Sequence, residues 1–232
     1  MSLFTVISAD PEKIPPRAGH SFAVPIFSHK CPNGHWTLLS HLPYGAYMAA
    51  NEGRHRFGPS GGRLTLRTYR SGLAAQAGHD LTIEITQWSG ELDGDDRAPE
   101  RLEARIDLRS LVIRAGTGGL KPLTDRDRRE IALTALKQLQ ADRYPEATFT
   151  AAQFAPDDSG GGTINGTLAL HGQSRPFALT VSKTGDGRYR AAGTVVQSEF
   201  GIKPYSGMFG ALKLRDAVDV EVGIDLSAAS HE

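Results

Sequence analysis

Hydrophobic and polar residues alternate with a period of two along eight stretches of the chain, as is typical of β-strands with one buried face. In the clearest stretch, Leu102, Ala104, Ile106 and Leu108 alternate with charged residues. Segments rich in Gly, Asp and Ser separate several of the stretches and suit tight reversals of the chain. The pattern predicts eight strands, at residues 63–70, 80–88, 101–109, 146–154, 163–170, 176–183, 188–196 and 216–226.

One segment has the period of a helix instead. Thr124 can serve as its N-cap, and Asp127 stands three residues later, as in a capping box. Pro145 ends any continuation of the helix. We therefore expect a single amphipathic helix of roughly four turns. Its apolar stripe consists of Ile131, Ala135 and Leu139, flanked by Ala132 and Leu136.

These elements predict a mainly β fold, in which an eight-stranded antiparallel sheet closes into a β-barrel beside one helix. Such a barrel holds its own side chains or one small ligand, and its closure removes exposed strand edges. The period alone leaves a β-sandwich open as the rival architecture. Residues 1–56 mix Pro, Gly and His without a period, and we expect an irregular N-terminal extension, either poorly ordered or not native to the mature protein. The barrel domain is predicted over residues 57–229.

Charge and cysteine content exclude several classes of function. The 232 residues include 26 Lys and Arg against 26 Asp and Glu, so the net charge of zero gives no general attraction to nucleic acid. No apolar run is long enough to span a bilayer, and the first 30 residues do not resemble a signal peptide. Cys31 is the single cysteine, so no intramolecular disulfide can form. The sequence predicts a soluble cytoplasmic protein and leaves a homodimer open.

Three residues are the candidates for chemistry. His79 and Asp80 stand together before a strand, where the imidazole could act as a base oriented by the carboxylate. No activated nucleophile accompanies them, and the favoured interpretation is that both bond backbone groups at the strand entrance. His171 lies beside Gly172 between two alternating stretches, where we expect a turn residue. The three could form a metal-ligand set, but their spacing does not indicate one, so no catalytic residue, metal or cofactor is predicted.

Four blocks of sequence form an ordered series. They contain a Gly-His-Asp turn between strands, a helix followed by Tyr-Pro, a His-Gly hairpin and a closing strand with alternating valines. They read LTLRTYRSGLAAQAGHDLTIEITQWSGEL, RDRREIALTALKQLQADRYPEATFTA, INGTLALHGQSRPFALTV and SEFGIKPYSGMFGALKLRDAVDVEVGIDL. From about Phe57 to Leu226 the chain thus resembles the YceI-like family of lipid-binding barrels. The resemblance implies a lipocalin-like barrel that holds an amphiphilic chain such as a polyisoprenoid or a fatty-acid derivative; some family members are periplasmic or secreted.

The inward stripes of the predicted strands supply the candidate cavity wall. The function expected is binding of a hydrophobic small molecule, an isoprenoid or acyl chain, by a carrier or storage protein without enzymatic activity. Two alternatives stay open: an enzyme or metal protein that uses the two histidines and Asp80, and a filled barrel that serves stress response or protein interaction without a ligand. The cavity candidates are Leu64, Leu66, Leu81, Ile83, Ile85, Ile106, Phe149, Phe177, Leu179, Val220, Val222 and Ile224.

Overall fold

A computed structural model describes residues 53–94, 99–226 and 230–231, and the counts below refer to these residues. Nearly all of the predicted extension, with Cys31, lies outside the described residues. The first strand begins at Arg54, three residues before the predicted start of the barrel domain.

Twelve described strands form one antiparallel sheet, and three short ones form a second. The large sheet has the order β15-β1-β5-β6-β8-β9-β10-β11-β14-β2-β4-β7, and the small sheet the order β12-β13-β3. The strands of the large sheet are β1 (Arg54–Phe57), β2 (Gly62–Thr68), β4 (Asp80–Ile85), β5 (Trp88–Gly94), β6 (Pro99–Asp107), β7 (Leu111–Thr117), β8 (Glu146–Pro156), β9 (Gly162–Leu170), β10 (Gln173–Gly185), β11 (Arg188–Val196), β14 (Ala217–Asp225) and β15 (Ser230–His231). The small sheet comprises β3 (Arg70–Ser71), β12 (Ser206–Gly207) and β13 (Leu212–Leu214).

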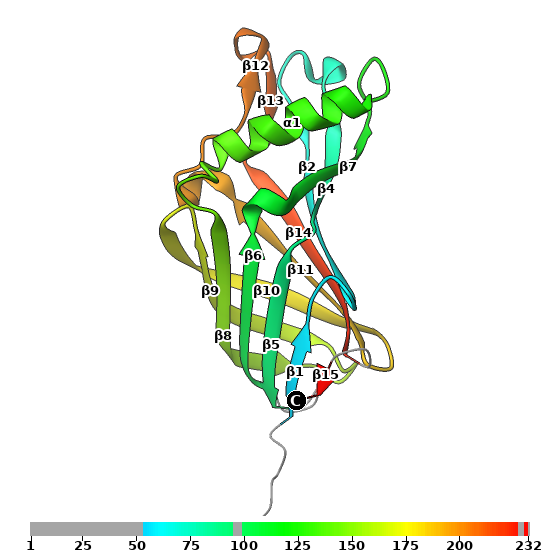
Figure 1. Cartoon of the computed structure of the whole chain (residues 1–232), viewed down its shortest axis with the longest axis vertical. Coiled ribbons are helices and arrows are strands. Elements are labelled where there is room, and N and C mark those ends of the chain that lie inside the picture. Colours follow the sequence, from blue (N-terminus) through cyan, green and yellow to red (C-terminus); the bar gives the residue numbers. More distant parts are fainter. Residues whose placement is uncertain (1–52, 95–98, 227–229, 232) are drawn as a thin grey trace, which may run out of the picture. The chain divides into compact units, whose positions relative to one another are not determined.

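The prediction of a mainly β, lipocalin-like fold with one helix is confirmed, and the strand count of eight is corrected. All eight predicted strands are present, as β2, β4, β6, β8, β9, β10, β11 and β14. The sequence pattern missed β5, which pairs with β6, and β7, which pairs with β4, together with the short strands. The large sheet is a single, strongly curled layer whose two ends, β15 and β7, do not pair with each other, so it forms a half-barrel (Figure 1). One continuous layer excludes the β-sandwich.

The helix α1 (Asp125–Gln138) begins after the predicted N-cap and has the length of roughly four turns that the pattern predicted, but it ends at Gln138, one residue before Leu139 of the predicted stripe. Thr124 accepts a hydrogen bond from the backbone N–H of Asp127, and the Asp127 carboxylate accepts one from the Thr124 N–H, which completes the capping box. The helix packs against β7 and crosses the sheet near one end (Figure 1). It thereby covers the edge strand, and its apolar stripe faces the core cluster that contains Leu111 and Ile113.

The two faces of the sheet differ because side chains alternate along each strand. The inner face holds the buried apolar residues, whereas the outer face holds ion pairs between adjacent strands. Glu221 on β14 lies 2.6 Å from Arg190 and 3.8 Å from Arg67, and Arg114 lies 2.7 Å from Glu84. The hydrogen bond from Arg190 lowers the pKa of Glu221. Because one face is charged and the other apolar, only the apolar face can turn inward. No helix in the described part of the chain is long and apolar enough to cross a membrane.

Four short 3₁₀ turns interrupt the loops of the described chain. They occupy Ala75–Ala77, Leu108–Ser110, Gln197–Phe200 and Met208–Gly210. The first and the last belong to loops at the end of the sheet where α1 lies (Figure 1).

Candidate functional site

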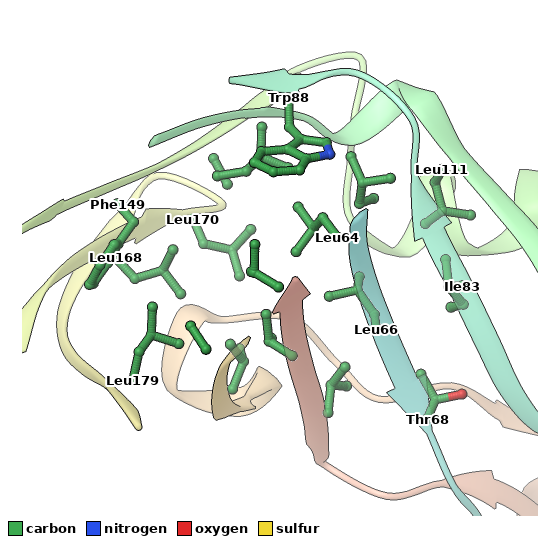
Figure 2. Close-up of a pocket in the computed structure, with 18 of the residues that line it drawn as sticks. Leu64, Leu66, Thr68, Ile83, Trp88, Leu111, Phe149, Leu168, Leu170 and Leu179 are labelled. Carbon is green, nitrogen blue, oxygen red and sulfur yellow. The ribbon is translucent and has the colours of Figure 1, made fainter. Parts of the chain in front are cut away.

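The curled sheet encloses a cavity of about 1150 Å³. Pockets for small molecules commonly measure roughly 300–1,000 Å³, so this one can admit a large ligand. Its wall is mostly aliphatic and aromatic, and side chains from β2, β5, β8, β9 and β10 converge on the space (Figure 2). The filled-barrel alternative does not fit a cavity of this volume.

All twelve residues proposed from the sequence line this cavity. They come from β2, β4, β6, β8, β10 and β14, and the strand register brings them together. Leu66 stands between Ile83 on β4 and Val220 on β14, while Leu64 stands between Ile85 and Val222. On the wall formed by β8, β9 and β10, the rings of Phe149 and Phe177 make an edge-to-face contact, with 5.9 Å between their centroids. Period-two alternation thus identified the inward face of each strand that it found.

The wall also contains residues of β5 and β7, which the alternation did not predict, and further residues of the predicted strands. Trp88 begins β5, and its indole lies at the edge of the apolar space, above Leu64 in the view of Figure 2. Trp88 and Leu92, on either side of Gly90, and Leu111 and Ile113 lie on the inner faces of β5 and β7. Lining residues not among the twelve include Phe57, Trp88, Leu92, Leu102, Ala104, Leu111, Leu168, Leu170, Tyr189, Ala191 and Ile202.

The wall becomes polar beside α1. Arg70, His79, Lys121, Asp127 and Glu130 all line the cavity there, close to half-buried Ile131 and Ala135 of the helix. Hydrogen bonds from Thr124 lower the pKa of the Asp127 carboxyl, which keeps it ionised at neutral pH. This end therefore combines an apolar interior with charged groups of both signs, an arrangement that suits an amphiphilic ligand.

The side chains of His79 and Asp80 form hydrogen bonds with backbone groups. The Nε2 atom of His79 hydrogen-bonds the carbonyl oxygen of Lys121 at 2.8 Å. Asp80 Oδ1 accepts the backbone N–H of Arg70 at 2.8 Å, and the Arg70 guanidinium donates to the carbonyl oxygens of Gly78 (2.8 Å) and Thr117 (3.3 Å). The Gly-His-Asp motif thus ties the start of β4 to the loop after β7. His79 borders the cavity, and Asp80 does not line it.

His171 lies at a hairpin turn, outside the cavity. It and Gly172 both have positive φ (53° and 74°), as a two-residue type I′ turn between β9 and β10 requires. Its Nδ1 atom donates to the carbonyl oxygen of Phe200 at 3.0 Å, and its ring lies 4.7 Å from that of Tyr144. A side chain at Gly172 would collide with Tyr144 (2.9 Å), so the turn needs glycine there.

The hypothetical metal-ligand set is not brought together. His79 bonds Lys121 in the loop after β7, whereas His171 packs between Tyr144 and Phe200. Across the described ranges, no cluster of three or more His, Cys, Asp or Glu side chains has the geometry to hold a metal ion.

Because His171 serves the turn, we expect His171→Asn to lower the free energy of unfolding by about 1–2 kcal/mol without changing ligand affinity. Asn tolerates positive φ but loses the ring contact with Tyr144 and the bond to Phe200. His171→Val, which adds the strain of a β-branched residue at positive φ, should cost more. Urea unfolding and ligand titration of both variants measure the two effects. A large loss of affinity in a stably folded Asn variant would contradict the structural role.

A strongly curled antiparallel sheet around an apolar cavity, with a helix across one end, defines the lipocalin-like class of barrel proteins. The model of the YceI-like domain matches residues 64–227. The chain belongs to the YceI-like family.

Similar proteins agree with this assignment. A UPF0312 protein of Shewanella baltica is 23% identical over 166 residues, which cover 68% of this chain and 76% of the relative. A UPF0312 protein of Pseudomonas savastanoi pv. phaseolicola is 24% identical over 125 residues, or 50% of this chain; there the chain spans only 60% of the relative's length. The crystal structure of Burkholderia cenocepacia BcnA matches with a TM-score of 0.50 at 16% identity, covering 70% of this chain and 94% of BcnA, and supports the fold alone.

Proposed function

We propose that this protein binds an amphiphilic lipid, a polyisoprenoid or a fatty-acid-like chain, with its hydrocarbon part inside the curled sheet and its polar head beside α1. The observation that carries the proposal is the cavity of about 1150 Å³ with its apolar wall. Lys121 at the polar end can meet the head group, beside Arg70 and His79, whose side chains also bond backbone carbonyl oxygens. The protein would act as a carrier or storage protein.

The size and apolar lining of the cavity favour a bound ligand. The cavity opens to solvent through the unclosed half-barrel and is lined mainly by apolar side chains, so without a ligand a large apolar surface stays in contact with water. Water can fill such a space, but apolar walls give it few hydrogen-bond partners. A hydrocarbon chain fits the wall better.

Burial of a long hydrocarbon chain can supply enough free energy for tight binding. Each buried methylene contributes about 0.8 kcal/mol, so a tail of some fifteen carbons gains on the order of 10 kcal/mol. Ordering the tail and desolvating the head subtract several kcal/mol, which leaves micromolar or tighter binding. The cavity is larger than the roughly 300–1,000 Å³ of common small-molecule pockets, so longer chains also fit.

The proposal treats the protein as a binder and not as an enzyme. The backbone hydrogen bonds of His79 and Asp80 support this, because neither group is paired with a nucleophile. A cytoplasmic location and a homodimer stay predictions of the sequence.

Native mass spectrometry of the full chain, purified without detergent, tests the proposal. We expect an adduct that denaturing conditions release and that organic extraction identifies as a lipid. Delipidated protein should regain one equivalent of a long-chain lipid with micromolar or lower Kd. A folded, delipidated protein that binds neither isoprenoid nor acyl chains would contradict the proposal.

A further inference from the structure

Three loops meet at the end of the sheet where α1 lies, and we call them together the loop tip: residues 69–79, 115–124 and 201–215. The backbone N–H of Ala74 donates to the carbonyl oxygen of Ala211 at 2.9 Å, and β3 pairs with β13. The bonds from Arg70 to Thr117 and from His79 to the Lys121 carbonyl oxygen join the first loop to the second. The three loops therefore form one surface, which Figure 1 places beyond α1.

Large apolar side chains concentrate on the loop tip. Within the described ranges, six large hydrophobic residues are exposed, and four of them belong to these three loops. Leu73 and Phe209 are fully exposed, Leu120 is 79% exposed and Met208 is 57% exposed. Such a cluster at the tips of adjacent loops marks an interaction site, in contrast to scattered single residues.

The backbone holds the most exposed of these side chains outward. Met208 and Phe209 are consecutive non-glycine residues with positive φ, 50° and 54°, between Gly207 and Gly210. This conformation is unfavourable for side chains with a Cβ and persists where the surrounding structure imposes it, often at functional sites. Here it presents a phenylalanine to solvent.

The three loops of the tip carry basic residues, whereas the acidic residues at this end, among them Asp80, Asp125 and Asp216, border the loops. The three segments contain no Asp or Glu. Arg70 is offset by Asp80 just outside the tip, 3.9 Å away, and Arg215 lies over the ring of Tyr69 at 5.6 Å. Basic residues beside exposed apolar ones match an anionic membrane surface, where each contributes electrostatic attraction. The basic residues of the tip are Arg70, Lys121, Lys203, Lys213 and Arg215.

We propose that the loop tip docks on an anionic phospholipid bilayer, so that a lipid passes between bilayer and cavity without crossing water. Leu120 and Lys121 line the cavity as well as belonging to the tip, and so do Leu212 and Leu214 of β13. The docking surface is thus continuous with the wall of the proposed binding site. This inference rests on the proposed function for its purpose, and the two are tested separately. A second copy of the chain is a poorer occupant, because two basic tips repel each other.

Fluorescence of a Phe209→Trp variant tests the docking directly, with the wild-type spectrum subtracted. We expect vesicles of equal parts phosphatidylcholine and phosphatidylglycerol to shift the added emission to the blue, and brominated lipid to quench it. An unchanged difference spectrum at saturating vesicle concentration would overturn the proposal.

Flotation with the same vesicles tests the contribution of the apolar side chains. The double variant Leu73→Ser and Phe209→Ser should lower the vesicle partition coefficient at least roughly tenfold, since each loses a large inserted side chain. Leu133→Ser, an exposed leucine on α1 outside the tip (67% exposed), is the matched control and should bind as the wild type does. Equal binding by wild type and double variant would overturn the proposal, and so would loss of a dimer in sedimentation without loss of vesicle binding.

Binding of cis-parinaric acid in vesicle-free buffer separates this inference from the proposed function. The double variant should keep the wild-type Kd for the free fatty acid but acquire it from vesicles at least roughly tenfold more slowly. Vesicle docking without parinaric acid binding would reject the lipid-binding function alone. Parinaric acid binding with transfer rates equal in wild type and double variant would reject the role of the tip.

Discussion

Ala191→Trp is expected to weaken the binding of a long-chain lipid about a hundredfold while the protein stays folded. Ala191 lines the cavity from β11, so an indole at this position occupies space that the ligand needs. Displacing roughly four methylene groups removes about 3 kcal/mol of binding free energy. Because the cavity has room for the new side chain, it should escape most of the strain that overpacking causes in a dense core. Titration with a fluorescent fatty acid measures the Kd.

Ala192→Trp is the matched control for this substitution. Ala192 is the next residue of the same strand, pairs with Thr180 and Glu221, and does not line the cavity. The same added volume should therefore leave the Kd unchanged. If both variants bind lipid as the wild type does, the ligand site lies elsewhere. If both lose binding together with their folded circular dichroism, the strand and not the cavity is responsible.

Ile85→Ala is expected to lower the free energy of unfolding by about 3 kcal/mol. Ile85 is only 1% exposed and lies between Leu64 on β2 and Leu111 on β7. Deleting buried aliphatic carbons costs their transfer free energy together with the cost of the space they leave. That space opens onto the existing cavity, so the cost should fall in the lower half of the usual range of about 2–5 kcal/mol. Urea unfolding of the delipidated protein measures it.

Val112→Ala is the comparison within the same strand pair. Val112 stands opposite Glu84 on the outer face of the sheet and is 36% exposed, so its truncation should cost well under about 1 kcal/mol. Saturating lipid should add stability to Ile85→Ala through ligand linkage, provided that the enlarged cavity still binds. Equal losses in the two variants would contradict the assignment of inner and outer faces.

Several elements could be predicted because their sequence patterns and their structures both depend on neighbouring residues only. The alternation around Leu64 and Leu66 marks β2 and its inner face, since side chains of a strand point to opposite sides. Thr124 and Asp127 locate the start of α1 because capping involves neighbouring residues only. The Gly-His-Asp motif was correctly placed at the entrance of β4.

Strands β5 and β7 were not predicted, because contacts with strands distant in the sequence determine some of their residues and their register. Gly90 interrupts the apolar alternation of β5, but a side chain at this position would collide with Phe57 of β1 at 2.2 Å. In β7 the register against β4 shifts between Thr82 and Ile83, which breaks the period. From the sequence alone, a glycine within a strand suggests that the strand ends there, although the glycine is needed for close contact with another strand.

The sequence by itself determined the mainly β class, the single helix and its cap, and the inward face of eight strands. Each of these follows from the periodicity or chemistry of neighbouring residues. Only the tertiary structure decided that twelve strands curl into a half-barrel, that the inward residues surround a cavity of about 1150 Å³, and that three loops gather exposed apolar residues at its polar end. Inward leucines and valines form the same pattern whether they fill a core or surround a cavity. The distance between opposite walls depends on how all strands pair, which no local pattern records.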